Sequence, residues 1–345
     1  MQATEVIRML LAGGHLGEQG MRQVVDDMLA DQLSPAQIAA VLVLLQAQGE
    51  HEEELLGAAR AMRHHAEAID VPDPERLLDT CGTGGDRRGL FNVSTTAAFV
   101  AAAAGARVAK HGNVAISGRS GSADVLREAG ACVDLPPQQV VRCIEEVGFG
   151  FLLAPRFHRT TQTVQAVRRE LGVRTIFNLL GPLTNPSHAG CQLIGIYDRA
   201  HLIPMAHVAG ALGGRHVLVV HSEDGCDEIS IAAPTAAAEW RDGKLHTYTI
   251  RPQAVGIASG AIDDLVVHSA ADSLRLLRDV LGGGQGPARQ MVMINAAAAL
   301  YVAGVAEDLA EGVCLAERAL DSGAALGRFE AFCALSQSLA DAGDK

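Results

Sequence analysis

The spacing of apolar residues changes along the chain, from a helical pattern at the start to an alternating pattern in the middle. In the first part, apolar residues recur every three or four positions, as between Val24 and Leu29. The pair Ser34-Pro35 suits a helix start, with the serine as cap and the proline at the first helical position. We therefore expect residues 1–70 to form a helical domain that ends where Pro72 and Pro74 interrupt the pattern.

From Leu77 onward, short apolar runs typical of buried strands alternate with helical segments. The expected strands are 107–109, 131–133, 149–153, 193–196 and 216–220, and the helices between them include 97–104, 123–129, 137–147 and 200–212. Such alternation favours a mainly parallel sheet with helices on both faces. An Asp-Gly turn at 242–243 predicts an antiparallel hairpin, and the last 75 residues are helical again.

The predicted fold class is therefore α/β, with a small all-helical domain beside a larger domain that has a mainly parallel sheet flanked by helices. The larger domain covers residues 71–345, and helices from about 160–190 are expected to join the helical domain. A chain of 345 residues is long enough for two domains, and its 48% hydrophobic content provides a sizeable core.

Charge and cysteine usage narrow the class of partner. The net charge of −12 argues against nucleic acid, because binding to a phosphate backbone needs clustered Lys and Arg. No apolar run reaches the ~18 residues that span a bilayer, and the N-terminus lacks the features of a signal peptide. The seven cysteines are scattered and contain no C-x-x-C pair, which is typical of reduced thiols. We expect a cytoplasmic protein that binds small molecules, with no membrane partner.

A glycine-rich segment, 79–86, is the strongest candidate for chemistry. It reads Asp-Thr-Cys-Gly-Thr-Gly-Gly-Asp and is followed by Asn-Val-Ser-Thr-Thr at 92–96, where an apolar helix begins. Glycines allow the backbone to turn tightly, and the N–H groups at a helix start bind phosphate well. The pattern is neither the P-loop nor the Rossmann fingerprint. The alternative, a sharp turn with a structural role alone, stays open at this point.

Four other polar segments interrupt the apolar background: Lys110-His111-Gly112-Asn113, residues 117–124, residues 168–186 and Asp227-Glu228. Two of them follow expected strands, and ligands of parallel α/β sheets bind beyond the strand carboxyl ends. The first could pair with phosphate, the second could form an anion nest, the guanidinium of Arg168 could clamp a carboxylate, and the two acids suit Mg²⁺. Each segment alone is also compatible with a solvated turn, linker or charged face.

Together these segments resemble the anthranilate phosphoribosyltransferase family over almost the whole chain. The resemblance rests on 82–86, 92–95, 110–113, 120–124, 174–186 and 227–228, in that order. It implies a fold of the nucleoside phosphorylase/phosphoribosyltransferase type and a homodimer formed through the helical parts. It also implies transfer of phosphoribose from phosphoribosyl pyrophosphate to the amine of anthranilate in tryptophan biosynthesis. Association with anthranilate synthase cannot be inferred from the sequence.

The resemblance also implies roles for individual residues. The catalytic residues would be Lys110, His111 and Asn113. Phosphoribosyl pyrophosphate would be held by Gly82, Gly85, Asp86, Asn92, Val93, Ser94, Thr95, Lys110, Ser117, Gly118 and Ser122. Anthranilate would meet Gly82, Asn113, His158 and Arg168. Two Mg²⁺ ions would be bound by Ser94, Asp227 and Glu228.

The chain departs from the family pattern in two places. Val114 follows Asn113 where the family often has Arg, and Arg87-Arg88-Gly89-Leu90 stands where Gly and Thr are common. The first difference removes a cation near the phosphates, which Arg87, Arg88 or Arg119 could replace. Two other functions stay open: a pyrimidine nucleoside phosphorylase, disfavoured because Gly-Asn follows Lys110-His111, and a non-catalytic binding paralogue.

Overall fold

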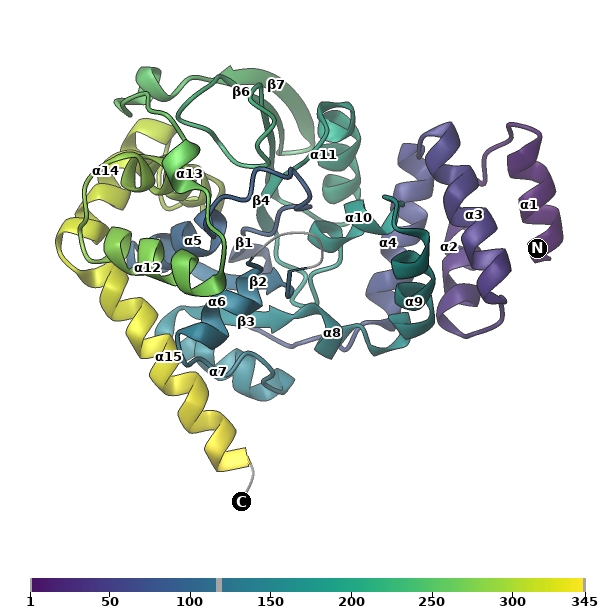
Figure 1. The fold of residues 1–345 in the computed structure, drawn as a ribbon, viewed down its shortest axis with the longest axis horizontal. Coiled ribbons are helices and arrows are strands. Elements are labelled where there is room, and N and C mark those ends of the chain that lie inside the picture. The colour runs from purple at the N-terminus through teal and green to yellow at the C-terminus, as the bar shows by residue number, and fades with distance from the viewer. Residues whose placement is uncertain (1, 116–119, 344–345) are drawn as a thin grey trace.

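A seven-stranded sheet organises the larger part of the molecule in the computed structural model, which describes residues 2–115 and 120–343. The strands are β1 (Leu77–Asp79), β2 (Arg107–Gly112), β3 (Phe149–Leu153), β4 (Cys191–Gly195), β5 (His216–Ser222), β6 (Thr235–Arg241) and β7 (Lys244–Ile250). Their order is β3-β2-β1-β4-β5-β6-β7. The first five are parallel, and the β6–β7 hairpin continues the sheet antiparallel to β5. The predicted fold class is confirmed (Figure 1).

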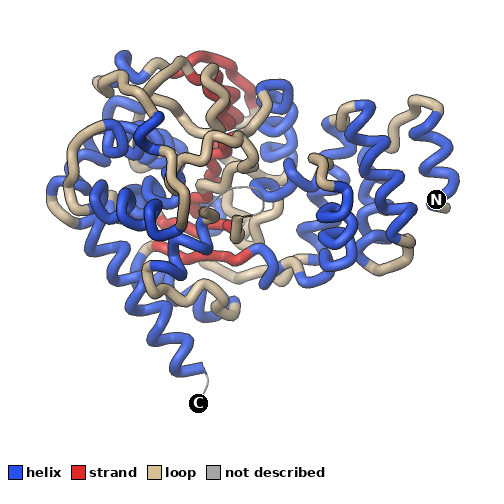
Figure 2. Tube along the Cα trace, viewed as in Figure 1, coloured by secondary structure: helices blue, strands red, loops and turns tan. Residues whose placement is uncertain are grey.

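Helices cover both faces of this sheet (Figure 2). They are α5 (Val93–Ala103), α6 (Ser122–Glu128), α7 (Pro137–Val147), α11 (Leu202–Ala211), α12 (Ala270–Leu281), α13 (Pro287–Ala303), α14 (Leu309–Asp321) and α15 (Ala324–Gly343). Side chains of β5 alternate between two apolar cores, since Leu218 and Val220 belong to one and Val217 and Val219 to the other. In the described part of the chain, no helix is long and apolar enough to cross a membrane.

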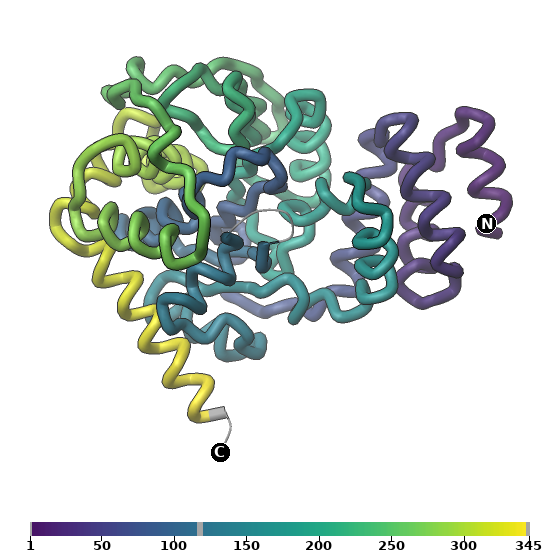
Figure 3. Tube along the Cα trace, in the orientation of Figure 1, coloured from purple at the N-terminus to yellow at the C-terminus, as the bar shows by residue number. Residues whose placement is uncertain are grey.

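The N-terminal helices form a group at one end of the molecule, in purple in Figure 3. They are α1 (Ala3–Leu11), α2 (Gly17–Leu29), α3 (Pro35–Gln48) and α4 (Glu52–His65), and α9 (Gln162–Leu171) packs on α2 and α3. The Ser34 hydroxyl accepts from the Gln37 amide over 3.4 Å and caps α3, while Pro35 takes the first helical position. The apolar core of this group continues onto the face of the sheet that α11 covers.

One expected strand does not form. Residues 131–133 have no regular structure, although Ala131 and Val133 are buried. The amide of Cys132 donates to the Ser336 hydroxyl of α15 over 3.1 Å instead of joining the sheet. A short apolar run predicts that a segment is buried but not that it is a strand, and this segment is buried beneath the C-terminal helix.

The order of the strands determines where a ligand can bind. β1 is the middle one of the five parallel strands, with β2 and β3 on one side and β4 and β5 on the other, so the chain changes direction across the sheet at β1. Such a switch point opens a crevice beyond the carboxyl ends of the strands. The loops that follow β1, β2, β4 and β5 all leave from this edge, and they carry most of the predicted site residues. The short helices α8 (Ala154–Phe157) and α10 (Phe177–Leu180) lie in the connections nearby.

Candidate active site

The loop that connects β1 to α5 carries the glycines expected to approach a phosphate. Gly84 and Gly85 have φ angles of +63° and +80°, a left-handed backbone that glycine adopts without the strain of a side chain. The Thr83 amide donates to the carbonyl oxygen of Gly195 over 2.8 Å and so anchors the loop to the end of β4. The first turn of α5 follows the loop, so a helix N-terminus and a glycine turn face the same crevice.

Lys110 connects β1, β2 and α5 at the bottom of this crevice. It lies on β2 and is 2% exposed. Its Nζ donates to the Thr80 carbonyl oxygen over 2.9 Å, to Thr80 Oγ1 over 3.1 Å and to Ser94 Oγ over 3.4 Å. A buried ammonium group is costly unless it is hydrogen-bonded and close to negative charge. Lys110 is therefore held as a fixed cation between the end of β1 and the start of α5.

Glu228 interacts with this cation and with Asp86, and Asp227 interacts with both Asp86 and Glu228, so we call Lys110, Asp86, Asp227 and Glu228 the donor cluster. Glu228 Oε1 accepts from the Ser94 amide over 3.1 Å, at the N-terminus of α5. Burial raises the pKa of Glu228 to about 7, although Lys110 and the Ser94 amide oppose the shift. Burial, then the charges of Asp86 and Glu228, raise the pKa of Asp227 well above its usual range. Carboxylates crowded in this way favour a bound cation or protons.

Glycines allow the backbone to approach the carboxylates closely. A Cβ atom at Gly195 would lie 1.5 Å from the carbonyl oxygen of Asp227, which no side chain permits. A Cβ atom at Gly82 would lie 3.5 Å from Asp227 Oδ2. The sequence analysis selected Gly82 and missed Gly195. A glycine at the end of an otherwise bulky apolar strand is the signal that could have identified it.

Asn92 connects two loops of the crevice. Its Oδ1 accepts from Ser120 Oγ over 2.8 Å and from Ser273 Oγ over 2.7 Å, and its Nδ2 donates to the Ser120 carbonyl oxygen over 3.3 Å. The side chain is therefore engaged in holding the loop after β2 beside α5. Ser117 and Gly118, which the sequence analysis placed on the same loop, lie outside the described residues.

The other predicted donor residues surround the start of α5 and α6. Val93 packs its side chain into the core at 1% exposure, so only its backbone faces the loop region. Thr95 Oγ1 is buried and has no hydrogen-bond partner within the described structure. Ser122 Oγ donates to the Asn113 carbonyl oxygen over 3.3 Å, and Asn113 Oδ1 accepts from the next amide over 2.8 Å. Residues from the loops after β1 and β2 are thus brought together as the sequence predicted.

Two buried histidines lie next to this crevice, with ring centroids 5.3 Å apart. Nδ1 of His111 lies 2.9 Å from the Gly181 carbonyl oxygen, and the His158 ring is hydrogen-bonded to the backbone of Thr184. A carbonyl oxygen accepts, so the bonded nitrogen of His111 carries the proton. Burial, then His158, lowers the pKa of His111 to about 3, and burial lowers the pKa of His158 to about 4. Both Nε2 atoms are buried without a partner in the described structure.

Arg168 lies on α9, in the segment that precedes α10. Its guanidinium donates to Asn178 Oδ1 over 3.4 Å and lies 5.5 Å from the centre of the Phe177 ring. Burial lowers its pKa from the ordinary arginine value. Asn178 is on α10, which ends directly before Gly181, the residue whose carbonyl oxygen binds His111. One short segment thus carries partners of both Arg168 and His111.

A buried pair that the sequence did not predict, Asp79 and Asn185, lies beneath the histidines. Asn185 Nδ2 donates to Asp79 Oδ2 and to the Ala109 carbonyl oxygen, each over 2.8 Å, and the amide of His111 donates to Asp79 Oδ1 over 3.1 Å. Burial raises the pKa of Asp79 to about 6, against the effect of Lys110 and of Asn185. The polar stretch Thr-Asn-Pro at 184–186, between apolar residues, was the available signal.

Val114 forms part of the wall of a groove of about 440 Å³. Arg127, Arg156 and Arg159 also line the groove, and Arg159 directly follows His158. Guanidinium groups are therefore present around the position where the family pattern has an arginine and this chain has valine.

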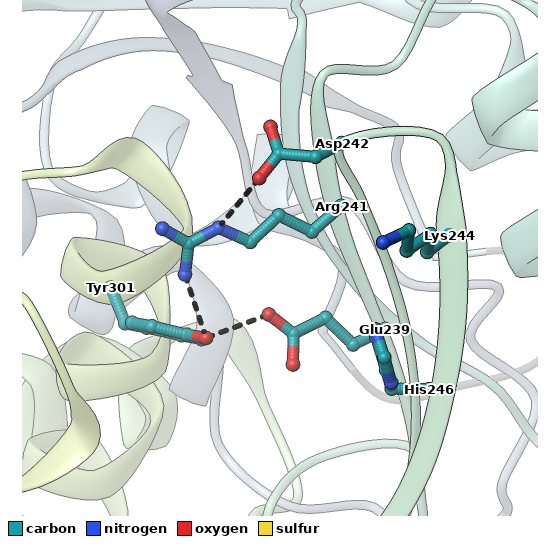
Figure 4. Close-up of a pocket in the computed structure, with 6 residues that line it drawn as sticks. All are labelled: Glu239, Arg241, Asp242, Lys244, His246 and Tyr301. Carbon is teal, nitrogen blue, oxygen red and sulfur yellow. Dashed lines mark hydrogen bonds and ion pairs between the residues drawn. The ribbon is translucent and has the colours of Figure 1, made fainter.

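A second polar cluster lies at the opposite edge of the sheet, around a pocket of about 360 Å³ (Figure 4). Glu239 Oε1 accepts from the Tyr301 hydroxyl over 2.7 Å and lies 2.7 Å from His216 Nε2. Arg241 donates to the Tyr301 oxygen over 3.1 Å. Burial alone would raise the pKa of Glu239, but hydrogen bonds from His216, Tyr301 and Tyr248 outweigh it and lower the pKa to about 2. We call Glu239, His216, Tyr301 and Arg241 the hairpin cluster.

Comparison with known proteins places the whole chain in one family. Residues 74–326 match the family model "Glycosyl transferase family, a/b domain", and residues 4–66 match the "helical bundle domain" of the same family. The chain is 48% identical over 340 residues to an anthranilate phosphoribosyltransferase of Methylococcus capsulatus, covering 99% of each protein.

Solved structures agree with the sequence comparison. The crystal structure of anthranilate phosphoribosyltransferase from Thermus thermophilus is similar with a TM-score of 0.90 and 41% identity, over 96% of this chain and 99% of that one. The enzyme from Saccharomyces cerevisiae in complex with PRPP and Mg is similar with a TM-score of 0.88 and 28% identity, over 97% and 98% of the two chains.

Proposed function

Because the chain belongs to the anthranilate phosphoribosyltransferase family, we propose that it transfers the phosphoribosyl group of phosphoribosyl pyrophosphate to the amine of anthranilate. The products are N-(5-phosphoribosyl)anthranilate and pyrophosphate, and the reaction belongs to tryptophan biosynthesis. The observation that carries this proposal is the donor cluster at the carboxyl edge of the sheet, directly beside two buried neutral histidines. The donor cluster suits a charged leaving group, and the two histidines suit a neutral amine.

The donor would bind where the glycine loop meets α5. Backbone N–H groups of Gly82, Gly85 and Asp86 and the start of α5 provide donors for phosphate oxygens. Lys110 supplies a fixed positive charge at the base of the crevice. Further contacts would come from Asn92, Val93, Ser94, Thr95, Ser122, Ser117 and Gly118, the last two being proposed from the sequence alone.

Mg²⁺ fits the residues of the donor cluster. Burial, followed by the charge of neighbouring carboxylates, raises the pKa values of the half-buried Asp227 and Glu228, and Ser94 Oγ lies at the same place. Within residues 2–115 and 120–343, no group of three or more His, Cys, Asp or Glu side chains is already arranged around a metal position. Mg²⁺ usually takes one or two protein carboxylates and completes its shell with substrate phosphate and water. Two such ions would neutralise the departing pyrophosphate.

The acceptor would bind against the histidines. His111 donates its Nδ1 proton to a backbone carbonyl and His158 is also bonded to backbone, so their unpartnered Nε2 atoms can accept from an amine N–H. The pKa values of about 3 and 4 keep both rings neutral at physiological pH. The guanidinium of Arg168 matches the planar carboxylate of anthranilate, and Asn113 and Gly82 would border the ring. An aromatic amine is already nucleophilic, so its alignment with the ribose carbon supplies much of the rate.

The helical group would form a homodimer. Leu11 at 68% exposed, Met9 at 36% and Val43 at 42% are large apolar side chains on α1 and α3. These two helices pack together at the end of the molecule far from the sheet (Figure 1). Exposed apolar residues gathered on adjacent helices mark an interaction surface. Light scattering should give twice the monomer mass, and Val43→Glu with Leu11→Glu should halve it.

An assay of anthranilate fluorescence tests the proposed activity. Anthranilate should be consumed only when phosphoribosyl pyrophosphate and Mg²⁺ are both present, with one pyrophosphate released per anthranilate. A parallel reaction with uridine and phosphate tests the nucleoside phosphorylase alternative. Turnover of uridine without consumption of anthranilate would replace the proposal with that alternative, and inactivity in both assays with intact binding would favour the non-catalytic paralogue. We also propose a cytoplasmic site of action, with which the seven free cysteines are compatible.

A further inference from the structure

Arg174 contacts the donor loop without belonging to it. It lies in the connection between α9 and α10, and its guanidinium donates to the carbonyl oxygen of Gly85. The same guanidinium stacks over the ring of Tyr197, with Cζ 3.9 Å from the ring centre. A planar cation held between an aromatic face and a carbonyl oxygen has little freedom to move. The side chain therefore forms a rigid support on the outer side of the loop.

The two halves of the loop are supported differently. On the inner side, the Thr83 amide bonds to Gly195, and the Tyr197 amide donates to Thr83 Oγ1 over 3.1 Å. The outer side contains Gly84 and Gly85, which have the greatest backbone freedom and both adopt positive φ. Arg174 binds at this outer side. Tyr197 therefore supports both halves, one through its amide and the other through the arginine stacked on its ring.

The bond to Gly85 also orients a backbone N–H group, that of Asp86, which could bind phosphate. In a trans peptide, the C=O and the following N–H point in opposite directions. Because Arg174 holds the Gly85 carbonyl outward, the amide of Asp86 points to the other side of the loop. Asp86 itself belongs to the donor cluster through its interaction with Asp227, so this amide is close to where the pyrophosphate would lie. Arg174 thus favours the backbone conformation that the donor needs before the donor arrives.

The same connection reaches the acceptor side. Asn178 Oδ1 accepts from Arg168 over 3.4 Å and from the Thr175 amide over 3.0 Å. Thr175 directly follows Arg174, so the arginine that would bind the acceptor and the arginine that binds the donor loop are fixed to one short segment. A shift of this segment would change both ends together.

We propose that Arg174 is a positioning residue that holds the Gly84–Gly85 turn in its donor-binding conformation and connects that turn to the acceptor-binding segment. It acts through Gly85 and touches neither substrate. The inference rests on the proposed function for its kinetic consequence, but its structural part concerns the loop alone.

Kinetics of matched arginine variants test the consequence. Arg174→Ala should raise KM for phosphoribosyl pyrophosphate roughly tenfold or more, the scale of one lost charged hydrogen bond, with a smaller rise for anthranilate. Arg174→Lys, which keeps one donor but loses the planar stack, should recover part of the loss, and Tyr197→Leu should give an intermediate defect. Arg169→Ala removes the same charge from the exposed side of α9 and should behave as the unaltered protein. Equal kinetics for Arg174→Ala and Arg169→Ala would overturn the inference.

Hydrogen exchange separates this inference from the proposed function. Peptides covering residues 80–90 should exchange faster in Arg174→Ala than in Arg169→Ala, whereas peptides from β4 and β5 should be unchanged. If residues 80–90 exchange faster in Arg174→Ala but the protein has no transferase activity, the role of Arg174 in supporting the loop stands and the proposed function is refuted. Unchanged exchange at 80–90 in an active enzyme would refute the role of Arg174, and faster exchange throughout would show a general loss of stability instead.

Discussion

The donor cluster and the hairpin cluster are both polar networks built around carboxylates, but they differ in how far their groups satisfy one another. In the hairpin cluster, one carboxylate receives hydrogen bonds from His216, Tyr301 and Tyr248, and its pKa falls to about 2. In the donor cluster, burial and neighbouring acids raise the pKa of Glu228 to about 7. The pKa values of Glu239 and Glu228 thus shift in opposite directions. The carboxylate of the hairpin cluster is fully hydrogen-bonded, whereas the carboxylates of the donor cluster favour a bound cation or protons.

The difference indicates which of the two clusters binds a ligand. Burying uncompensated carboxylates costs stability, and natural proteins accept this cost at functional sites. The Nε2 atoms of His111 and His158, beside the donor cluster, are likewise unsatisfied, since they are buried without a hydrogen-bond partner within the described structure. The hairpin cluster lies at the amino ends of the parallel strands, where this fold does not place ligands. We therefore interpret the hairpin cluster as a structural network that joins the hairpin to α13.

Removal of charge from the donor cluster should have the largest effect. Asp227→Asn combined with Glu228→Gln should lower kcat/KM by at least ~10², because the pyrophosphate loses a preorganised electrostatic contact. Steady-state kinetics over a range of Mg²⁺ concentrations provide the measurement. Glu239→Gln is the matched control from the hairpin cluster and should stay within about twofold of the unaltered protein. Near-normal turnover of the double variant at saturating Mg²⁺ would contradict the assignment.

Loss of Arg168 should affect the acceptor alone. Arg168→Ala removes a charged hydrogen-bond donor, worth about 1.5–3 kcal/mol, so KM for anthranilate should rise roughly tenfold or more. KM for phosphoribosyl pyrophosphate should change much less, because Arg168 is bonded to Asn178 and not to the donor loop. The neighbouring exposed Arg169→Ala serves as the control. Equal increases in both KM values would show that Arg168 supports the site in general.

The sequence predicted the parts of the fold and the site that depend on local pattern. Helical spacing identified the N-terminal helices, and apolar runs identified the parallel strands, apart from 131–133, where burial under α15 imitates a strand. Lys110 could be placed at the same edge as the glycine loop because parallel strands end at one edge of a sheet, and its Nζ binds Thr80 at the start of that loop. These are predictions in which position along the chain determines position in space.

The remaining contacts depend on the path of loops, which a pattern does not record. Asn185 reaches Asp79 from 106 positions along the chain, and Arg174 reaches Gly85 from 89 positions. Neither pair shows a spacing that distinguishes it from a solvated polar group. The hairpin cluster was missed for the same reason, since Tyr301 comes from α13, 62 positions after Glu239.

A methyl group on the glycine loop should separate binding from stability. The Cβ of Gly85→Ala would lie 3.7 Å from the Arg174 guanidinium, so there is space for it, but the φ of +80° is strained for alanine by ~1–3 kcal/mol. The variant should lose binding of phosphoribosyl pyrophosphate by calorimetry while its thermal transition stays within a few degrees. Gly283→Ala imposes the same strain at φ +91° in open space and should retain binding. Retained binding in Gly85→Ala, with loss of folding, would show that the glycine has a structural role.

The two clusters should also respond oppositely to pH, which is the smallest effect expected. The folded pKa of Glu228 lies above its unfolded value of 4.5, so without Mg²⁺ its contribution to stability is full below pH 4.5 and is lost as pH rises towards 7. The folded pKa of Glu239 lies below 4.5, so its contribution is present above that pH and is lost as pH falls towards 2. The two residues therefore give stability slopes of opposite sign.

Denaturant unfolding in EDTA at about pH 8 measures this contrast. Glu228→Gln should increase the free energy of unfolding by up to about 3 kcal/mol, since each unit of pKa shift is worth about 1.4 kcal/mol. Glu239→Gln should decrease it by about 1–2 kcal/mol, the value of a buried hydrogen bond to a charged group. At about pH 5 the gain from Glu228→Gln should largely vanish, while the loss from Glu239→Gln should persist. Saturating Mg²⁺ should remove the advantage of Glu228→Gln at about pH 8, because the bound cation compensates the carboxylate that the variant lacks. Destabilisation by both variants at that pH would mean that the carboxylates of the donor cluster are as well satisfied as that of the hairpin cluster, and that they do not need a bound cation.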